Sequence, residues 1–433
     1  MGPDVSVLRA HPWVQLAVLV VAAMAGVFSR TALGPVQESL RIALHLTDNQ
    51  IALLQGAALA LPLSLAAVPL GLAADRYSRA RLMLAAIALA WVGTVLTALA
   101  HGFALLFVSR CLVGFAAPAT AIIAFSLLAD LYPPRRRGRA TMMVVLGQSA
   151  GSALAFALGG QLAALAGPGP DSWRWALLGM ALGLLPVIPL VLLLREPQRT
   201  GAAVRARTAQ NLGSQLWACR GILSVLLGAM CLVNLADGAV LVWAAPSLSR
   251  RLGLPPGRVG AIMASSLLIG GFLGPLLGGL IADSCQSAGG PRRTVAMLGW
   301  LALLSAPMSF FAMTPGGPSA SVPLASVMLV IFMIVGTALS VMTTAVSIVV
   351  IPNELLGLCV SLKFAGAVVF GLGLAPLIVS LLAGMMGGPA MIGRALACLC
   401  AAASLSGAIM FAIGRRYFPN SAPTTQRDAA GLR

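Results

Sequence analysis

Charged side chains are scarce in this chain of 433 residues. They make up 9% of the residues, whereas hydrophobic residues make up 59%. A soluble domain carries about 25% charged residues, so the composition excludes an ordinary soluble protein. Many apolar runs reach the length of about 20 residues that a helix needs to cross roughly 30 Å of hydrocarbon. The sequence therefore predicts an all-α polytopic membrane protein.

Residues that hold metals or perform catalysis are also sparse. The three histidines are far apart, and the seven cysteines lack the spacing of metal ligands. No G-x-x-x-x-G-K phosphate loop and no H-E-x-x-H pair is present. The sequence predicts no metal site, no cofactor, no ATP hydrolysis and no enzymatic activity.

The basic residues are unevenly distributed along the chain. The net charge of +17 could indicate a nucleic-acid partner, but the arginines gather in alternate short loops, which is the positive-inside pattern. With the N-terminus inside, 19 arginines fall in inner segments and only six in outer ones, namely Arg41, Arg174, Arg250, Arg251, Arg258 and Arg394. We therefore expect no nucleic acid, a multi-pass protein of a cell (inner) membrane, and both termini in the cytoplasm.

The apolar runs predict twelve spans, at 12–34, 49–73, 82–100, 104–131, 140–166, 173–194, 220–246, 259–282, 294–313, 322–350, 358–385 and 391–414. The longest polar stretch, 195–219, lies between the sixth and the seventh span. We expect an N-terminal half (1–194), a cytoplasmic linker (195–219), a C-terminal half (220–414) and a cytoplasmic tail (415–433), in a protein that is monomeric.

Two pairs of similar segments indicate an internal repeat. The sequence from Gly71 to Asp75 closes the second span, and a similar sequence from Gly279 to Asp283 closes the eighth. At the end of the fourth span Asp130 is followed by two prolines, and at the end of the tenth span a proline is followed by Glu354. Parallel repeats of six helices are one common plan of secondary transporters.

The motifs in these segments resemble those of the major facilitator superfamily. Gly71-x-x-x-Asp75-Arg76-x-Ser78-Arg79-x-Arg81 is similar to the superfamily's loop between spans two and three, and Arg110-x-x-x-Gly114 to its fourth-span arginine motif. Gly270-x-x-x-Gly274-Pro275-x-x-Gly278-Gly279 is similar to a motif of drug exporters, which place it in span five rather than eight. The resemblance implies twelve helices in two pseudo-symmetric halves and the function of a transporter.

The segments 30–37 and 46–56 resemble the bacterial spinster-like branch of that superfamily. Members of the branch usually have an aspartate just before the first-span arginine and a glutamate in span four. This chain has Ser29 and Ala117 at those positions. The two acidic residues that would carry protons in that branch are therefore missing from this chain.

By the same resemblance, the repeated acids would form a gate at the cytoplasmic ends of the helices. Asp75 would pair with Arg139 or a neighbouring arginine and face the positive N-terminal end of span eleven, while Gly71 would allow close helix packing. A plain role in fixing the topology is the alternative. The full set of gate candidates is Gly71, Asp75, Arg76, Arg79, Asp130, Arg139, Asp283 and Glu354.

Ionisable residues inside a membrane are costly and are candidates for function. Arg30 can bind an anion or take part in coupling, or it can snorkel to the surface. Arg110 can act in proton transfer or bond to backbone carbonyls of the first spans. Asp237, which shares a helix face with Asn234, can carry a proton or form a structural ion pair with Arg30. Lys363 can bind an anion near the inner gate or snorkel.

Gln55, Gln148 and Ser152 are further candidates for lining a central cavity, although such residues often bond to a neighbouring backbone. If Arg30, Arg110, Lys363 and Asp237 all faced that cavity, its net charge would be positive and would favour an anionic or zwitterionic substrate.

The sequence thus predicts a secondary active transporter of a small organic anion or an amphipathic or zwitterionic solute, working by alternating access and coupled to protons through Asp237 with Arg30. Its partners would be the substrate, protons and the lipid bilayer. The alternatives are a multidrug-type exporter of lipophilic compounds and a receptor of the same fold that does not transport.

Overall fold

The computed structural model describes residues 11–196, 217, 219–313, 321–351 and 353–420. These residues form helices and no strands. Eleven helical stretches among them are long and apolar enough to cross a membrane. One stretch, which includes α13 (Pro256–Met308), contains two spans, because Gly290 with φ +64° interrupts the helix after its first 33 residues. The described helices thus agree with the twelve predicted spans.

The first six spans form the N-terminal half. Its helices are α2 (Pro12–Thr31), η1 (Gly34–Val36), α3 (Gln37–Ala43), α4 (Asp48–Gln55), α5 (Ala57–Arg76), α6 (Arg79–Ala98), α7 (Phe103–Leu131), α8 (Pro134–Leu165), α9 (Ser172–Leu184) and α10 (Val187–Val191).

The last six spans form the C-terminal half. After α12 (Arg220–Leu252) and α13 come η2 (Ser309–Met313), α14 (Ser321–Val350), α15 (Asn353–Gly366), the π-helical segment η3 (Ala367–Leu374), α16 (Ala375–Met386), η4 (Pro389–Met391), α17 (Ile392–Gly414) and η5 (Arg415–Tyr417).

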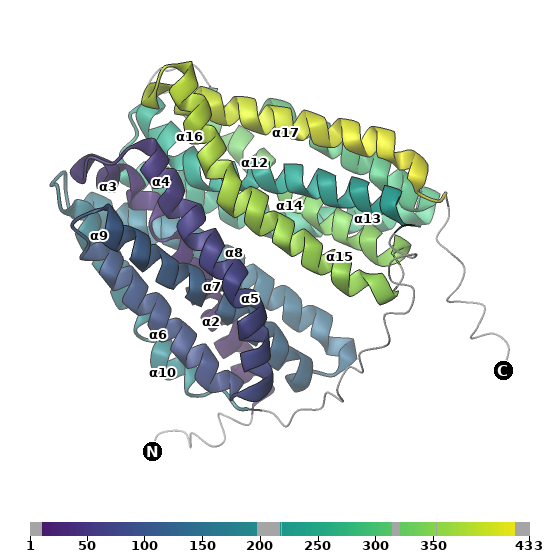
Figure 1. The fold of residues 1–433 in the computed structure, drawn as a ribbon, viewed down its shortest axis with the longest axis horizontal. Helices are drawn as coiled ribbons and strands as arrows, with labels where there is room; N and C mark the ends of the chain where they lie inside the picture. Colours follow the sequence, from purple (N-terminus) through teal and green to yellow (C-terminus); the bar gives the residue numbers. More distant parts are fainter. Residues whose placement is uncertain (1–10, 197–216, 218, 314–320, 352, 421–433) are drawn as a thin grey trace.

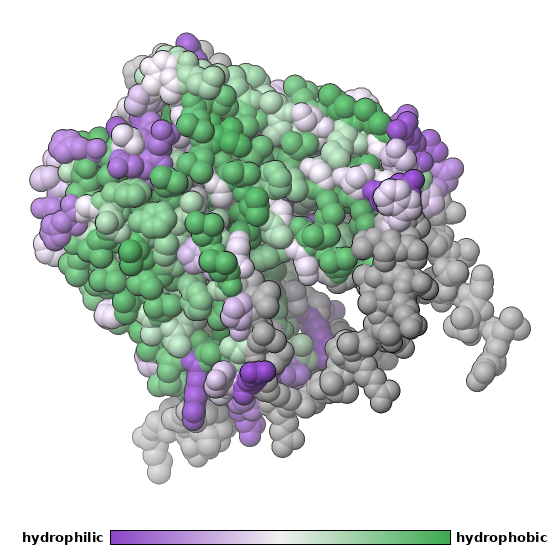
Figure 2. Space-filling view, viewed as in Figure 1, coloured by the Kyte–Doolittle hydropathy of each residue, from purple (hydrophilic) through white to green (hydrophobic). Residues whose placement is uncertain are grey.

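The two halves meet near one end of the helices and diverge towards the other (Figure 1). The closed end holds α3, α4 and α16, and the Ser380 hydroxyl on α16 donates a hydrogen bond of 2.6 Å to the side-chain oxygen of Asn49 on α4. The other end, where α5 finishes at Arg76 and α8 begins at Pro134, is called here the arginine-rich end. Figure 2 shows the visible surface hollowed between the two halves on that side.

Glycines allow the two halves to touch backbone to backbone. The Cα of Gly260 on α13 is only 3.0 Å from the position that a Cβ of Gly160 on α8 would occupy. A Cβ at Gly56, between α4 and α5, would lie 3.0 Å from the carbonyl oxygen of Gly373. Because the helices cross without intervening side chains, these contacts need glycine.

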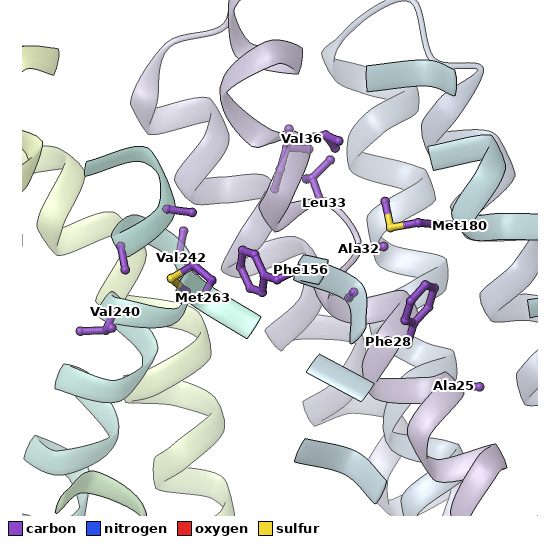
Figure 3. Close-up of a cluster of buried hydrophobic side chains, with 14 of the residues drawn as sticks. Ala25, Phe28, Ala32, Leu33, Val36, Phe156, Met180, Val240, Val242 and Met263 are labelled. Atoms are coloured by element: carbon purple, nitrogen blue, oxygen red, sulfur yellow. The ribbon is translucent and has the colours of Figure 1, made fainter. Parts of the chain in front are cut away.

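The apolar core continues across the junction of the halves. Phe156 of α8 is fully buried, and Figure 3 shows it with Val242 and Met263 of the C-terminal half on one side and Leu33 of the N-terminal half nearby. Continuous packing of this kind holds the halves together at the closed end.

The glycine–proline motif that resembles drug exporters packs within the C-terminal half. A Cβ at Gly270 or Gly278 would press on Met333 or Ala338 of α14, and the Thr337 hydroxyl of α14 donates to the Gly270 carbonyl at 2.8 Å. In this chain Gly270, Gly274 and Gly278 of the motif therefore serve the packing of span eight on span ten.

Replacing Gly238 by alanine is expected to destabilise the protein. The new methyl group would collide with the backbone carbonyl of Gly371 in η3, which cannot move aside as a side chain could. Overpacking of this kind costs about 1–3 kcal/mol, so the apparent melting temperature in detergent should fall. Gly384→Ala on α16 is the matched control, because its Cβ meets nothing within 4 Å, and it should leave the melting temperature unchanged or raise it.

Candidate functional site

Arg110 holds the end of the first span in place. The last carbonyls of α2 lack partners within the helix, and the guanidinium of Arg110 donates to the carbonyl oxygen of Arg30 at 2.6 Å. The same nitrogen donates to Gln55 Oε1 at 3.3 Å, and Gln55 donates to Gln37. Arg110 is 2% exposed. The bond to the Arg30 carbonyl fits the backbone-bonding interpretation of Arg110, whereas its part in proton transfer stays a prediction.

The side chain of Arg30 opens into a small cavity between the halves. Within the described residues its guanidinium has no hydrogen-bond or ion-pair partner. The Arg30 pocket, as we call it, is mostly apolar and is lined by Arg30, Thr31, Gly34, Gln55, Leu59, Phe156, Leu241, Val242 and Leu372. One free cationic group against an apolar wall suits an amphipathic anion. Of the other expected lining residues, Ser152 is buried and lies 3.4 Å from the Thr31 hydroxyl.

Asp237 lies in a different place. It lines a second cavity, inside the C-terminal half, between α12, α13, α14 and α17. Asn234, expected on the same face, instead donates to the Met230 carbonyl of its own helix at 2.8 Å and lies against Gly371. The ion pair between Arg30 and Asp237 that the sequence allowed is not formed in this structure.

The remaining polar candidates are separate as well. The Lys363 ammonium on α15 donates to the Thr344 hydroxyl on α14 at 2.6 Å, and Gln148 on α8 is half-buried. The four intramembrane charges therefore do not share one cavity, and the charge of the Arg30 pocket is set by Arg30, with Arg110 close behind it.

A cluster of four charges joins the halves at the closed end, and we call it the Arg250 cluster. Arg250 of α12 binds both oxygens of Asp48 at 2.7 and 2.9 Å and Glu38 at 2.9 Å. Arg41 pairs with Glu38 at 2.7 Å within its own half. The Arg250 side chain is only 13% exposed, so these contacts are screened less than surface ion pairs.

A second cluster lies at the arginine-rich end and is called the Arg79 cluster. The Arg79 guanidinium binds Asp130 at 2.6 Å and Glu196 at 3.1 Å, and Glu196 also accepts from Ser78 and the Ala80 amide. Arg79 and Asp130 were candidates from the sequence, and the structure brings them together. Burial alone would raise the pKa of Glu196, but the hydrogen bonds from Ala80, Arg79 and Ser78 outweigh it and hold that pKa below its usual value.

Replacing Glu196 by glutamine is expected to lower the free energy of unfolding near neutral pH by about 1 kcal/mol. The reason is that a charge-assisted hydrogen bond is lost from a partly exposed site. The lowered pKa fixes the sign of the pH dependence. The stabilisation is present above the pKa of an unfolded glutamate and disappears as pH falls through the lower folded value. Melting temperatures in detergent should therefore differ between wild type and variant near neutrality and converge in acid; a constant difference would contradict this.

The other gate candidates give a mixed picture. Arg76, Arg139 and Asp283 are exposed, and no ion pair of theirs occurs in the described part of the chain. The surroundings of Gly71 and the side chains of Asp75 and Glu354 lie outside what the structure describes, so the gating role of these three residues stays a prediction. The Arg250 cluster and Glu196 were not among the candidates, because charges at span ends usually only mark topology.

Gly147-Gln148-Ser149-Ala150-Gly151 has the Gly-x-Ser-x-Gly spacing of hydrolase nucleophile elbows. Those elbows lie on a sharp turn between a strand and a helix. Here the segment lies inside the continuous helix α8, where Gly147 and Gly151 pack against Val20 and Met24 of α2. The spacing therefore serves helix packing, and the exposed turn of an elbow is missing.

Two six-helix halves with a cavity between them are the architecture of a transporter. Residues 19–243 match the family model described as Major Facilitator Superfamily. This chain belongs to the major facilitator superfamily.

Relatives and solved structures point to the spinster-like branch. Spinster homolog 1 of Rattus norvegicus is 30% identical over 213 residues, which are 48% of this chain and 39% of the rat protein. The 3-(3-hydroxy-phenyl)propionate transporter of Escherichia coli K12 is 28% identical over 218 residues, which are 50% of this chain and 52% of that protein. This chain thus spans about half or less of the curated relatives it matches.

Among solved structures, a bacterial homolog of the human lysosomal transporter spinster, in an inward-facing and unoccupied conformation, matches with a TM-score of 0.74 and 21% identity, over 96% of both chains. A D-xylose–proton symporter matches with a TM-score of 0.68 and 13% identity, over 94% of this chain and 98% of that chain. These structures show that the fold is shared.

Proposed function

We propose that this chain is a secondary active transporter of an amphipathic organic anion, coupled to protons. The observation that carries the proposal is the Arg30 pocket, where a guanidinium without a described protein partner faces an apolar wall between the halves. Leaving such a charge unpaired inside a membrane is costly, and a bound carboxylate or phosphate would remove much of that cost. The name of the Escherichia coli relative, an aromatic carboxylate transporter, supports the same class of substrate.

The conformation fits a state of alternating access that is open to the cytoplasm. The Arg250 cluster and the Ser380–Asn49 bond close one end of the molecule. The arginine excess assigns the other, divergent end to the cytoplasm. On this assignment the substrate enters or leaves the Arg30 pocket from the cytoplasm in the present state.

Counterflow in proteoliposomes tests the proposal. Vesicles loaded with unlabelled 3-(3-hydroxyphenyl)propionate should take up the labelled compound faster than empty vesicles, and the uptake should saturate. Competition by other aromatic carboxylates and lack of competition by tetraphenylphosphonium are the expected results. Saturable exchange of that lipophilic cation, without exchange of the carboxylate, would overturn the proposal.

A multidrug-type exporter of lipophilic compounds is the second candidate. The mostly apolar wall of the Arg30 pocket favours it. The glycine–proline motif does not support it here, because Gly270, Gly274 and Gly278 pack against α14. The tetraphenylphosphonium arm of the same experiment distinguishes the two candidates.

A further inference from the structure

A second cavity lies wholly within the C-terminal half. We call this small cavity the Asp237 pocket. It is lined by Val233, Ala236, Asp237, Ala302, Ser305, Phe332, Gly336, Leu339, Ser404 and Gly407. Its lining residues other than Asp237 are buried, so this is an interior space among four helices and not an extension of the Arg30 pocket.

The carboxylate of Asp237 is the pocket's one charged group, and no hydrogen-bond or ion-pair partner for it is found in the described residues. A Cβ at Gly336 would lie 2.5 Å from Asp237 Oδ1, so the absence of a side chain at Gly336 makes the room for the carboxylate. An unpaired carboxylate among apolar helices costs several kcal/mol in its charged form. Taking up one proton removes that cost.

The geometry points to a proton-binding site at Asp237 that is physically separate from the substrate pocket. This assignment rests on the proposed transport function and names where its coupling proton binds. The proton comes from bulk water, converts the carboxylate to a neutral acid, and returns to water on the other side of the membrane.

The other polar groups of the pocket suit a proton better than a metal cation. Besides Asp237, the pocket offers the hydroxyls of Ser305 and Ser404, which are bonded to each other at 2.8 Å. A divalent cation such as Ca²⁺ needs six to eight oxygen ligands, more than these side chains provide. Of the surrounding helices, α17 adds the Cys400 thiol, which donates to the Ala236 carbonyl, while the lining residues from α13 and α14 are not titratable.

A short path connects this pocket with the substrate pocket. Gly238, next to Asp237, packs directly on the backbone of Gly371 in the π-helical segment η3. Leu372, the next residue of η3, lines the Arg30 pocket, as do Leu241 and Val242 one turn further along α12. Single π-helical turns are frequent at functional sites. A change in the charge of Asp237 can therefore affect the substrate pocket through α12 and η3, without direct contact between Asp237 and that pocket.

Infrared difference spectroscopy on the purified full chain tests the site without any substrate. Lowering the pH within the range above about 6, where ordinary carboxyl groups stay ionised, should produce the carbonyl band of a protonated carboxylic acid, and Asp237→Asn should remove that band. Asp171→Asn is the control, because Asp171 is an exposed carboxylate paired with Arg174. Persistence of the band in Asp237→Asn would overturn the assignment. So would loss of the wild-type band at fixed pH when sodium replaces choline, which would indicate a metal cation.

A second variant, which keeps Asp237, is needed because Asp237→Asn could fail to fold. Gly336→Ala keeps the carboxyl group but crowds it, so the midpoint of the band should shift, whereas Gly384→Ala should not shift it. If Gly336→Ala leaves the midpoint of the band unchanged, the titrating carboxyl does not lie in this pocket.

Transport then links the site to coupling. With one proton per anion, a gradient of one pH unit supports about tenfold accumulation. Asp237→Asn should lose this accumulation of 3-(3-hydroxyphenyl)propionate while keeping counterflow at equal pH. Retained accumulation would overturn the assignment, whereas failure of wild-type counterflow would overturn the proposed function and leave the spectroscopic test standing.

Discussion

Replacing Arg30 by glutamine is expected to weaken binding of 3-(3-hydroxyphenyl)propionate about a hundredfold. Hydrogen bonds to a charged group are worth about 1.5–3 kcal/mol each, and 1.4 kcal/mol corresponds to a factor of ten in affinity. Among the residues that the structure describes, the Arg30 guanidinium is the only charged group that lines the Arg30 pocket, so no other described lining residue can replace it. Equilibrium binding to the purified protein measures the effect directly.

Two further variants make the Arg30 result interpretable. Arg30→Lys keeps the charge but loses the planar fork that binds a carboxylate with two bonds, so it should fall between wild type and Arg30→Gln. Arg258→Gln removes an exposed arginine outside the pocket and should bind as wild type does. Wild-type affinity in Arg30→Gln would place the anion site elsewhere.

Replacing Arg250 by alanine is expected to open the closed end of the molecule. The change leaves Glu38 and Asp48 partly buried without their partner from the other half. Breaking a buried pair costs about 3 kcal/mol or more, which changes the ratio of closed to open states about a hundredfold. The shift favours a state that is open at the end of the Arg250 cluster, because only the closed state contains these bonds.

A disulfide across the halves reports the shift. Asn49 and Ser380 are hydrogen-bonded through their side chains, so cysteines at both positions should cross-link readily in the closed state. Cross-linking is read after cleavage at a protease site inserted within 195–219, with the exposed Cys398 replaced. It should slow strongly in Arg250→Ala.

Arg41→Ala is the matched control for this experiment. Arg41 binds the same two carboxylates, but it belongs to the same half as they do. If its removal slows cross-linking as much as removal of Arg250, the contact between the halves is not what closes this end.

The fold could be predicted largely from the sequence because hydrocarbon thickness dictates the length of each span. The break between the eighth and ninth spans follows from Gly289, Gly290 and Pro291, where the helix is interrupted. Arg79 and Asp130 were both gate candidates from the sequence, and the structure shows that they form an ion pair with each other.

The composition of the site was harder to predict. Arg30 and Asp237 were both recognised as costly intramembrane charges, but the sequence does not give the rotation of each helix about its axis. Asp237 in fact faces Gly336 within its own half. The partners of Arg250 depend on how the two halves assemble, and Glu196 acquires its role only when the chain after α10 folds back to Ser78 and Arg79.

The contact between Gly160 and Gly260 has a mechanical consequence. From Gly160 the helix α8 extends 26 residues to Pro134 but only five to Leu165, which gives arms of about 39 Å and about 8 Å. A rocking motion about this contact therefore moves the end of α8 at the arginine-rich end about five times as far as its opposite end. A displacement of about 2 Å at the short arm would accompany a swing of about 10 Å at the long arm.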